Sequence, residues 1–331
     1  MLGSEKSSIG QNPEVSAPVQ ELKFNANGKF KIVQFTDTHF IYQNKKSDIT
    51  LERMAEVLDA EKPDLVIHTG DTIFGKPAKE SLETILNLIS QRNIPFAIAW
   101  GNHDAEFGLT REELLKIAQS IPHNLTCTEP GISGVSNYIL SIKSADGSKT
   151  SRLLYMFDSH DYSKVENVKG YDYIKRDQID WYCRKSKEFT QLNGGKPIPA
   201  LAFFHIPLPE YNQAVSKENA ILFGVRKEGV CSPQLNSGLF AAMKEMGDVE
   251  GTFVGHDHDN DYGVMWHDIL LAYGRYTGGN TVYNHLANGA RVIELTDGQK
   301  GFKTWIRLKD NKIENEVIFP DSYQKDKPAN G

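Results

Sequence analysis

Side chains that can bind a metal ion recur in five short motifs spread along the chain. The motifs read FTDTHF, HTGDTIF, WGNHDAE, FFHIPLP and FVGHDHDND, and their candidate ligands are Asp37, His39, Asp71, Asn102, His205, His256 and His258. Imidazole nitrogens mixed with carboxylate and amide oxygens suit Zn, Mn or Fe better than Mg or Ca alone. A carboxylate can also bridge two cations about 3.5 to 4 Å apart, as in two-metal hydrolytic sites. We therefore predict two divalent metal ions, bridged by Asp71.

The elements that precede these motifs must bring them together. Short apolar runs predict strands at residues 31–35, 64–68, 95–100, 153–157, 200–204 and 251–254, and the periodicity between them predicts helices at residues 49–60, 78–91, 111–119, 176–189 and 238–246. This alternation is typical of α/β proteins, in which loops beyond the carboxyl ends of the strands line a common crevice. The motifs are therefore expected to converge. The shorter, more aromatic segments after residue 263 are expected to complete a second sheet as antiparallel edges.

The composition fits a folded globular protein without a broad basic surface. Hydrophobic residues make up 39% and charged residues 24% of the 331 residues, which is ordinary for a globular protein. The formal net charge of -6 argues against a broad basic surface for nucleic acid. Two cations beside two carboxylates would still make the pocket locally cationic.

The chain is predicted to hold one domain, at residues 24–320, between a polar leader at residues 1–23 and a polar tail at residues 321–331. The leader suits a flexible tether, as would remain after removal of an export signal. We therefore favour an exported location (periplasm, cell envelope or secreted), with a cytoplasmic one as the alternative. No stretch approaches 18 apolar residues, so no membrane span is predicted. The three widely spaced cysteines lack the spacing of a metal or redox site and are expected to be unpaired or incidental.

All five motifs occur in the order that characterises the calcineurin-like metallophosphoesterases, and the chain resembles this family over residues 30–308. The longer phrases DTIFG, GYDYIKRDQIDWY and HIPLPE resemble an atypical subgroup of purple acid phosphatase-like proteins that are labelled probable inactive. The resemblance implies a four-layer α-β-β-α sandwich of two mixed sheets.

The resemblance also implies a role for each site residue. Asp71 would be shared between one metal held by Asp37, His39 and His258 and another held by Asn102, His205 and His256. His103 would lie beside the leaving-group oxygen and act as the acid, with Asp104 orienting its ring. A metal-activated hydroxide would attack phosphorus in line. The implied function is the hydrolysis of phosphate monoesters. The expected partner is then a phosphorylated small molecule or a phosphoprotein, with phosphate as product.

One position departs from the pattern of the purple enzymes. They carry a tyrosine three residues after the Gly-Asp aspartate, and its phenolate binds ferric iron and gives the colour. This chain has Phe74 there. Because a phenyl ring cannot bind a metal through oxygen, we predict a colourless protein without an obligatory ferric ion.

Two other functions stay open on the sequence. A phosphodiesterase acting on nucleotides or lipids shares the same metal motifs. A non-catalytic scaffold that binds phosphorylated ligands would fit the label of the subgroup, although no ligand is missing here.

Contacts to substrate are predicted for Asn102, His160 and Arg226. His160 follows the strand at residues 153–157 in the segment DSHDYS and would line the pocket rim, and Arg226 lies in a loop flanked by glycines. An arginine fork matches phosphate oxygens, but a solvated basic loop explains Arg226 equally well. The histidines outside the motifs, His68, His123, His267 and His285, are expected to be structural or exposed.

Overall fold

Alternating strands and helices build two sheets in the computed structural model, which describes residues 21–324. The six-stranded sheet has the order β14-β13-β12-β2-β3-β4. Its strands are β2 (Lys29–Phe35), β3 (Leu65–His68), β4 (Phe96–Ile98), β12 (Gly289–Thr296), β13 (Phe302–Leu308) and β14 (Ile313–Phe319). The strands β2, β3 and β4 run parallel, and β12, β13 and β14 add antiparallel neighbours. The sheet is therefore mixed.

The eight-stranded sheet has the order β1-β5-β6-β7-β9-β11-β10-β8. Its strands are β1 (Leu22–Lys23), β5 (Tyr138–Lys143), β6 (Thr150–Met156), β7 (Ala200–Phe203), β8 (Leu222–Phe223), β9 (Val249–Val254), β10 (Gly263–Trp266) and β11 (Ile269–Tyr273). The central strands β6, β7, β9 and β11 are mutually parallel, and the pairs β5–β6, β11–β10 and β10–β8 are antiparallel. This sheet is mixed as well.

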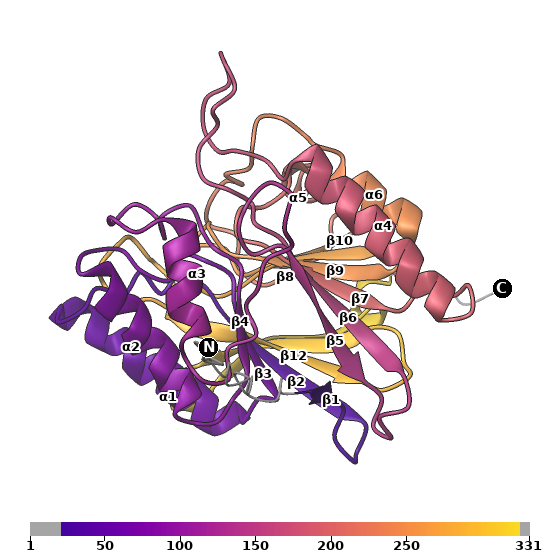
Figure 1. Cartoon of the computed structure of the whole chain (residues 1–331), viewed down its shortest axis with the longest axis horizontal. Helices are drawn as coiled ribbons and strands as arrows, with labels where there is room; N and C mark the ends of the chain where they lie inside the picture. Colours follow the sequence, from indigo (N-terminus) through magenta and orange to yellow (C-terminus); the bar gives the residue numbers. More distant parts are fainter. Residues whose placement is uncertain (1–20, 325–331) are drawn as a thin grey trace, which may run out of the picture.

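Helices cover the outer face of each sheet (Figure 1). The helices α1 (Asp48–Glu61), α2 (Ala78–Ser90) and α3 (Arg111–Gln119) pack on the six-stranded sheet, and α4 (Arg176–Leu192), α5 (Pro209–Val215) and α6 (Leu239–Met246) on the eight-stranded one. Short 3-10 turns lie at Lys45–Ser47, Lys309–Asn311 and Asp321–Tyr323. In the described part of the chain, no helix is both long and apolar enough to cross a membrane.

Three buried clusters hold the layers together. The middle cluster lies between the two sheets and joins Ile32 and Leu65 of one sheet to Leu154 and Phe253 of the other. The outer clusters join the sheets to their helices, for example through Met54 and Leu58 of α1, which lie one turn apart and face inward. The predicted four-layer α-β-β-α sandwich is confirmed. Apolar side chains on both faces explain why the central strands lack polar alternation.

The region after residue 263 differs from the prediction. The strands β10 and β11 form a hairpin, but β11 pairs in parallel with β9. The antiparallel strands that complete the other sheet are β12, β13 and β14. The prediction was wrong about β11 because aromatic content does not reveal which arm of a hairpin pairs with an earlier strand.

The predicted domain limits also shift at both ends. Leu22 and Lys23, assigned to the leader, form β1 and pair with β5, while residues 1–20 lie outside the described part. Tyr323, assigned to the polar tail, is buried beside Phe223 and Phe319, and residues 325–331 lie outside the described part. An isolated aromatic residue in a polar segment thus packs into the core.

Candidate metal centre

The candidate ligands lie just beyond the carboxyl ends of five strands from both sheets. The parallel strands β2, β3 and β4 lead into the first three motifs, and β7 and β9 of the other sheet lead into the last two. The structure brings together Asp37, His39, Asp71, Asn102, His205, His256 and His258, all of them buried. Sequence separation is therefore no obstacle, because the parallel strands end at the same edge.

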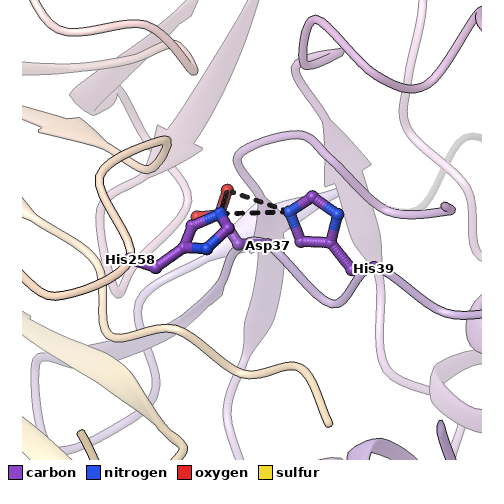
Figure 2. A group of neighbouring side chains, drawn as sticks. All are labelled: Asp37, His39 and His258. Carbon is purple, nitrogen blue, oxygen red and sulfur yellow. Dashed lines mark hydrogen bonds and ion pairs between the residues drawn. The ribbon is translucent and has the colours of Figure 1, made fainter. Parts of the chain in front are cut away.

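One group of potential ligands consists of Asp37, His39 and His258, whose ligand atoms lie within 4.8 Å of one another. The Nε2 atoms of His39 and His258 lie 3.8 and 3.6 Å from Asp37 Oδ1 and 3.2 Å from each other. Figure 2 shows the His39 ring facing the Asp37 carboxylate, which overlaps the His258 ring in this view. Three side chains thus converge on one small volume, with a nitrogen, nitrogen and oxygen donor set.

A second group consists of Asp71, His205 and His256. The Nε2 atom of His205 lies 3.2 Å from Asp71 Oδ2, 3.3 Å from His256 Nδ1 and 3.2 Å from Asn102 Oδ1. The amide oxygen of Asn102 therefore points into the same group as the three ionisable side chains.

Asp71 lies between the two groups. Its Oδ2 atom is 3.2 Å from Nε2 of His205 in one group and 3.6 Å from Nε2 of His39 in the other. Each group contains one carboxylate, Asp37 in the first and Asp71 in the second. Asp71 is close enough to a histidine of each group to be a candidate shared ligand.

Hydrogen bonds at the outer ring nitrogens show that a cation fits this arrangement. His205 Nδ1 lies 2.7 Å from the Thr69 carbonyl oxygen, and His258 Nδ1 lies 2.9 Å from the Tyr283 carbonyl oxygen. A carbonyl only accepts, so both Nδ1 atoms donate. In a neutral ring Nε2 then carries a lone pair that faces other acceptors, which repel it unless a proton or a cation lies between. Backbone carbonyls commonly orient metal-binding histidines in this way.

The protonation states point the same way. Burial lowers the pKa of His39 to about 3 and that of His256 to about 3, so both rings are neutral and able to bind a metal. His205 differs: burial opposes its charge, but the charge of Asp71 outweighs burial and raises the pKa of His205 to about 9. A proton thus takes the place that a cation would fill among these groups.

The backbone at the centre is strained. Asp37, His39, Asp71 and His256 have φ angles of 51°, 41°, 52° and 78°, in the left-handed region that side-chain-bearing residues rarely adopt. A Cβ atom at Gly255 would collide with Thr36 and Asp37. The glycine of the Gly-His motif is therefore required by close approach of two loops, and the strain is of the kind found at functional sites.

The structure places Asp104 differently from the expectation that it orients the His103 ring. Its carboxylate accepts hydrogen bonds from the backbone N–H groups of Gly101, Asp71, Thr72 and Ile73, at 2.8, 3.0, 2.7 and 3.3 Å. A buried carboxylate with four amide donors has no free lone pair directed at the ring. Asp104 instead ties the loop after β4 to the loop after β3.

The partner of the His103 ring is Glu106, whose Oε2 lies 2.7 Å from Nδ1. The spacing of three residues was the only sequence signal for this contact. The backbone N–H of His103 also donates to Asp71 Oδ1 at 2.9 Å, so the residue is fixed beside the second metal group.

Aromatic rings surround the centre. Phe74 lies against His39 and His103, with ring centroids 4.9 and 5.0 Å apart. Tyr171 lies against His256 at 4.3 Å, and Tyr283 stacks on His258 at 4.4 Å. Phe74 therefore contributes an apolar wall to the centre. That the protein is colourless stays a prediction, based on this residue.

Two predicted substrate contacts lie at the margin. The His160 ring is hydrogen-bonded through Nε2 to Gln178 Oε1 at 2.8 Å, and its carbonyl accepts from Arg111. Arg226 is exposed, and its backbone pairs with Asn260 in an isolated bridge two residues beyond His258. The ring of His160 is thus engaged by α4. Of the other histidines, His68 is buried between the hydroxyls of Thr38 and Thr72.

The fold and the clustered nitrogen and oxygen donors are those of a metallophosphoesterase, and the sequence profile of the calcineurin-like phosphoesterases matches residues 30–260. The chain belongs to this family. Within it, the chain is 36% identical to "Probable inactive purple acid phosphatase 29" of Arabidopsis thaliana, over 94% of this chain and 91% of that protein. It is 35% identical to "Phosphatase DCR2" of Saccharomyces cerevisiae, over 92% of this chain and 58% of that protein.

A solved structure shares the fold at low sequence identity. It is a dimetal phosphatase from Danio rerio, which matches with a TM-score of 0.57 and 12% identity over 87% of this chain and 98% of that chain. The agreement supports the layered architecture described above. The expected resemblance to the atypical purple acid phosphatase-like subgroup is confirmed by the relatives.

Proposed function

We propose that this protein hydrolyses phosphate monoesters with the help of two divalent cations, Mn, Zn or Fe. The observation that carries the proposal is the pair of buried donor groups that meet at Asp71, with the His103 ring beside them. The name phosphatase borne by the yeast relative favours monoesters over diesters. The substrate would be a phosphorylated small molecule or phosphoprotein.

Each side chain has a distinct part in this proposal. Asp37, His39 and His258 would hold one cation, Asn102, His205 and His256 the other, and Asp71 would belong to both. When bound, the cations would supply Lewis acidity, an acidified water and a positive charge that two carboxylates only half neutralise. His103 would donate a proton to the leaving-group oxygen, a step that typically contributes about 10²- to 10⁴-fold to the rate. Asp104 would keep the two loops in register through its backbone contacts.

The test compares p-nitrophenyl phosphate with bis(p-nitrophenyl) phosphate. Initial rates are measured on protein that has been stripped of metal and then reloaded with Mn, Zn or Fe(II). We expect metal-dependent cleavage of the monoester at the higher kcat/KM. A higher kcat/KM for the diester would assign the protein to the phosphodiesterases instead, with nucleotide or lipid esters as the next substrates to try.

The name of the plant relative, "Probable inactive purple acid phosphatase 29", favours one rival function, a scaffold that binds phosphorylated ligands without turnover. The complete donor set argues against this reading, because a centre that has lost its activity usually loses ligands as well. His103→Ala separates the two. As an enzyme, the variant should lose about 10²- to 10⁴-fold in kcat and keep its metal content. A metal-loaded wild type that binds phosphate but cleaves neither ester would establish the scaffold.

A further inference from the structure

We infer that Glu106 and Tyr162 form a positioning pair for His103, in addition to the residues already assigned to the centre. The inference rests on the proposed function, because it concerns the proton donor of that reaction. Glu106 and Tyr162 come from two different loops, one after β4 and the other after β6. Their meeting point is the Nδ1 side of the His103 ring.

The contacts form a short chain of hydrogen bonds. Glu106 Oε2 lies 2.7 Å from His103 Nδ1, and the Tyr162 hydroxyl donates to the other oxygen, Oε1, at 3.1 Å. The side chains of His103 and Glu106 are 27% and 36% exposed, and Tyr162 is 43% exposed. Exposed contacts of this kind add little to folding stability. A carboxylate held from both sides at the edge of a metal centre is better explained by what it does to the histidine.

Tyr162 is itself held in place from the far side of the centre. Its ring stacks on Tyr171 with centroids 5.8 Å apart, and the two residues pair in an isolated antiparallel bridge. Tyr171 in turn packs edge-on against His256 at 4.3 Å. A continuous row of side chains therefore connects the proton donor to a ligand of the second metal group.

The effect on His103 follows from which nitrogen is occupied. With Nδ1 bound to the carboxylate, Nε2 is the ring nitrogen left to face the reacting oxygen. Glu106 fixes the plane of the ring and stabilises the imidazolium form, the form that carries a proton on Nε2 to donate, as the aspartate does in a Ser-His-Asp triad. Asp104 cannot do this, because its oxygens are used by backbone amides. Glu106 and Tyr162 are thus positioning residues that act through His103.

The experiment uses Glu106→Ala, Glu106→Gln and Tyr162→Phe in the metal-loaded full chain. Glu112→Gln is the matched control, because Glu112 is an exposed acid in the adjoining helix α3. Rates are measured with p-nitrophenyl phosphate and with phenyl phosphate. Phenolate is a poorer leaving group than p-nitrophenolate, so cleavage of phenyl phosphate depends more on a proton from His103. Metal content is measured on every variant.

We expect Glu106→Ala to lower kcat on phenyl phosphate about 10- to 100-fold, the usual effect of removing a partner that orients a functional histidine. The loss on p-nitrophenyl phosphate should be smaller, and KM and metal content should stay unchanged. Glu106→Gln should recover part of the rate, and Tyr162→Phe should lose only a fewfold.

Three outcomes would overturn the inference. The first is that Glu106→Ala has the same kcat as Glu112→Gln. The second is that it lowers kcat equally on both substrates, and the third is that its metal content falls. The failure of the proposed function looks different, because the wild type would then cleave neither ester with any metal. The two ideas are therefore tested separately by the same set of proteins.

Discussion

Two buried polar clusters in this molecule have opposite characters. The first lies at the C-terminal end of α1, where Glu61 is 4% exposed. Its carboxylate accepts hydrogen bonds from Trp305 Nε1 at 3.0 Å, Arg307 Nε at 2.6 Å and Lys31 Nζ at 3.0 Å. Every contact there joins a donor to an acceptor. At the metal centre, by contrast, His205 Nε2 faces the oxygens of Asp71 and Asn102, a contact that is favourable only with a proton or a cation between these atoms.

The backbone repeats the difference. Glu61 is the last residue of the helix α1, Trp305 and Arg307 lie in the strand β13, and none of the three has a left-handed φ angle. Asp37, Asp71 and their neighbours at the metal centre have left-handed conformations. A buried polar cluster in which every acceptor has a donor, on unstrained backbone, stabilises the fold. A cluster in which acceptor atoms face one another, on strained backbone, is of the kind that binds an external group.

The largest effect should come from removing the shared ligand. Asp71→Asn takes away the carboxylate that faces both donor groups, so we expect kcat/KM on p-nitrophenyl phosphate to fall about 10³-fold, which corresponds to about 4 kcal/mol. The control is Asp268→Asn, whose side chain is 84% exposed and paired only with Lys244. Equal activity of the two variants would remove Asp71 from the centre.

Metal removal should destabilise the protein by the next largest amount. A ligand present at 100 times its Kd stabilises the folded state by about 2.7 kcal/mol. We therefore expect urea denaturation to give a free energy of unfolding that is lower in a chelator than in Zn or Mn at 100 times Kd, by about 2.7 kcal/mol for each cation bound. The difference should vanish in Asp71→Asn. A difference that persists there would mean that the cation binds elsewhere.

Changing Glu61 should affect stability and leave catalysis alone. Glu61→Gln removes a charged acceptor with three donors, so we expect the free energy of unfolding to fall by about 2 kcal/mol. Glu52→Gln is the control, because Glu52 lies on the exposed face of the same helix. If Glu61→Gln lowered kcat as strongly as Asp71→Asn, the division between a structural and a functional cluster would be wrong.

The smallest effect concerns pH. Burial opposes the charge of Glu61, but hydrogen bonds from Trp305, Arg307 and Lys31 hold its pKa below the ordinary value of 4.5. A depressed pKa contributes stability above the unfolded value, and this is lost as the pH falls through the folded value. The stability difference between wild type and Glu61→Gln, measured by urea denaturation, should therefore shrink below pH 4.5. A constant difference would show that the charge does not matter.

The sequence was sufficient for the parts of the fold with a strong local pattern. Apolar runs identified β2, β3, β4, β6, β7 and β9, and the segment after Thr110 predicted a helix where α3 begins. The strands β1 and β5 and the helix α5 were not predicted. For β1 and α5 the reason is length, because a two-residue strand and a seven-residue helix carry too little periodicity. The pairing of β11 is set by tertiary packing and has no local signature.

At the site, the motif residues were predictable and their supports were not. Each ligand follows a strand, so its position can be read from the chain. Glu106, Tyr162 and Tyr283 reach the centre through loops whose paths depend on the whole fold. Asp104 shows the converse, since its residue type suggested a partner for His103 while its burial gave it four backbone amides.

The supply of ligands by both sheets has a consequence for how the protein matures. The backbone N–H of His256 donates to Asp37 Oδ1 at 3.2 Å across 219 positions of the chain. Contacts of such long range form late, because closing the intervening loop costs entropy before they give any return. A complete donor set therefore exists only in a chain whose two halves have docked. Cation binding would then stabilise only those chains whose two halves have docked, and would shift the folding equilibrium toward them and away from partly folded chains.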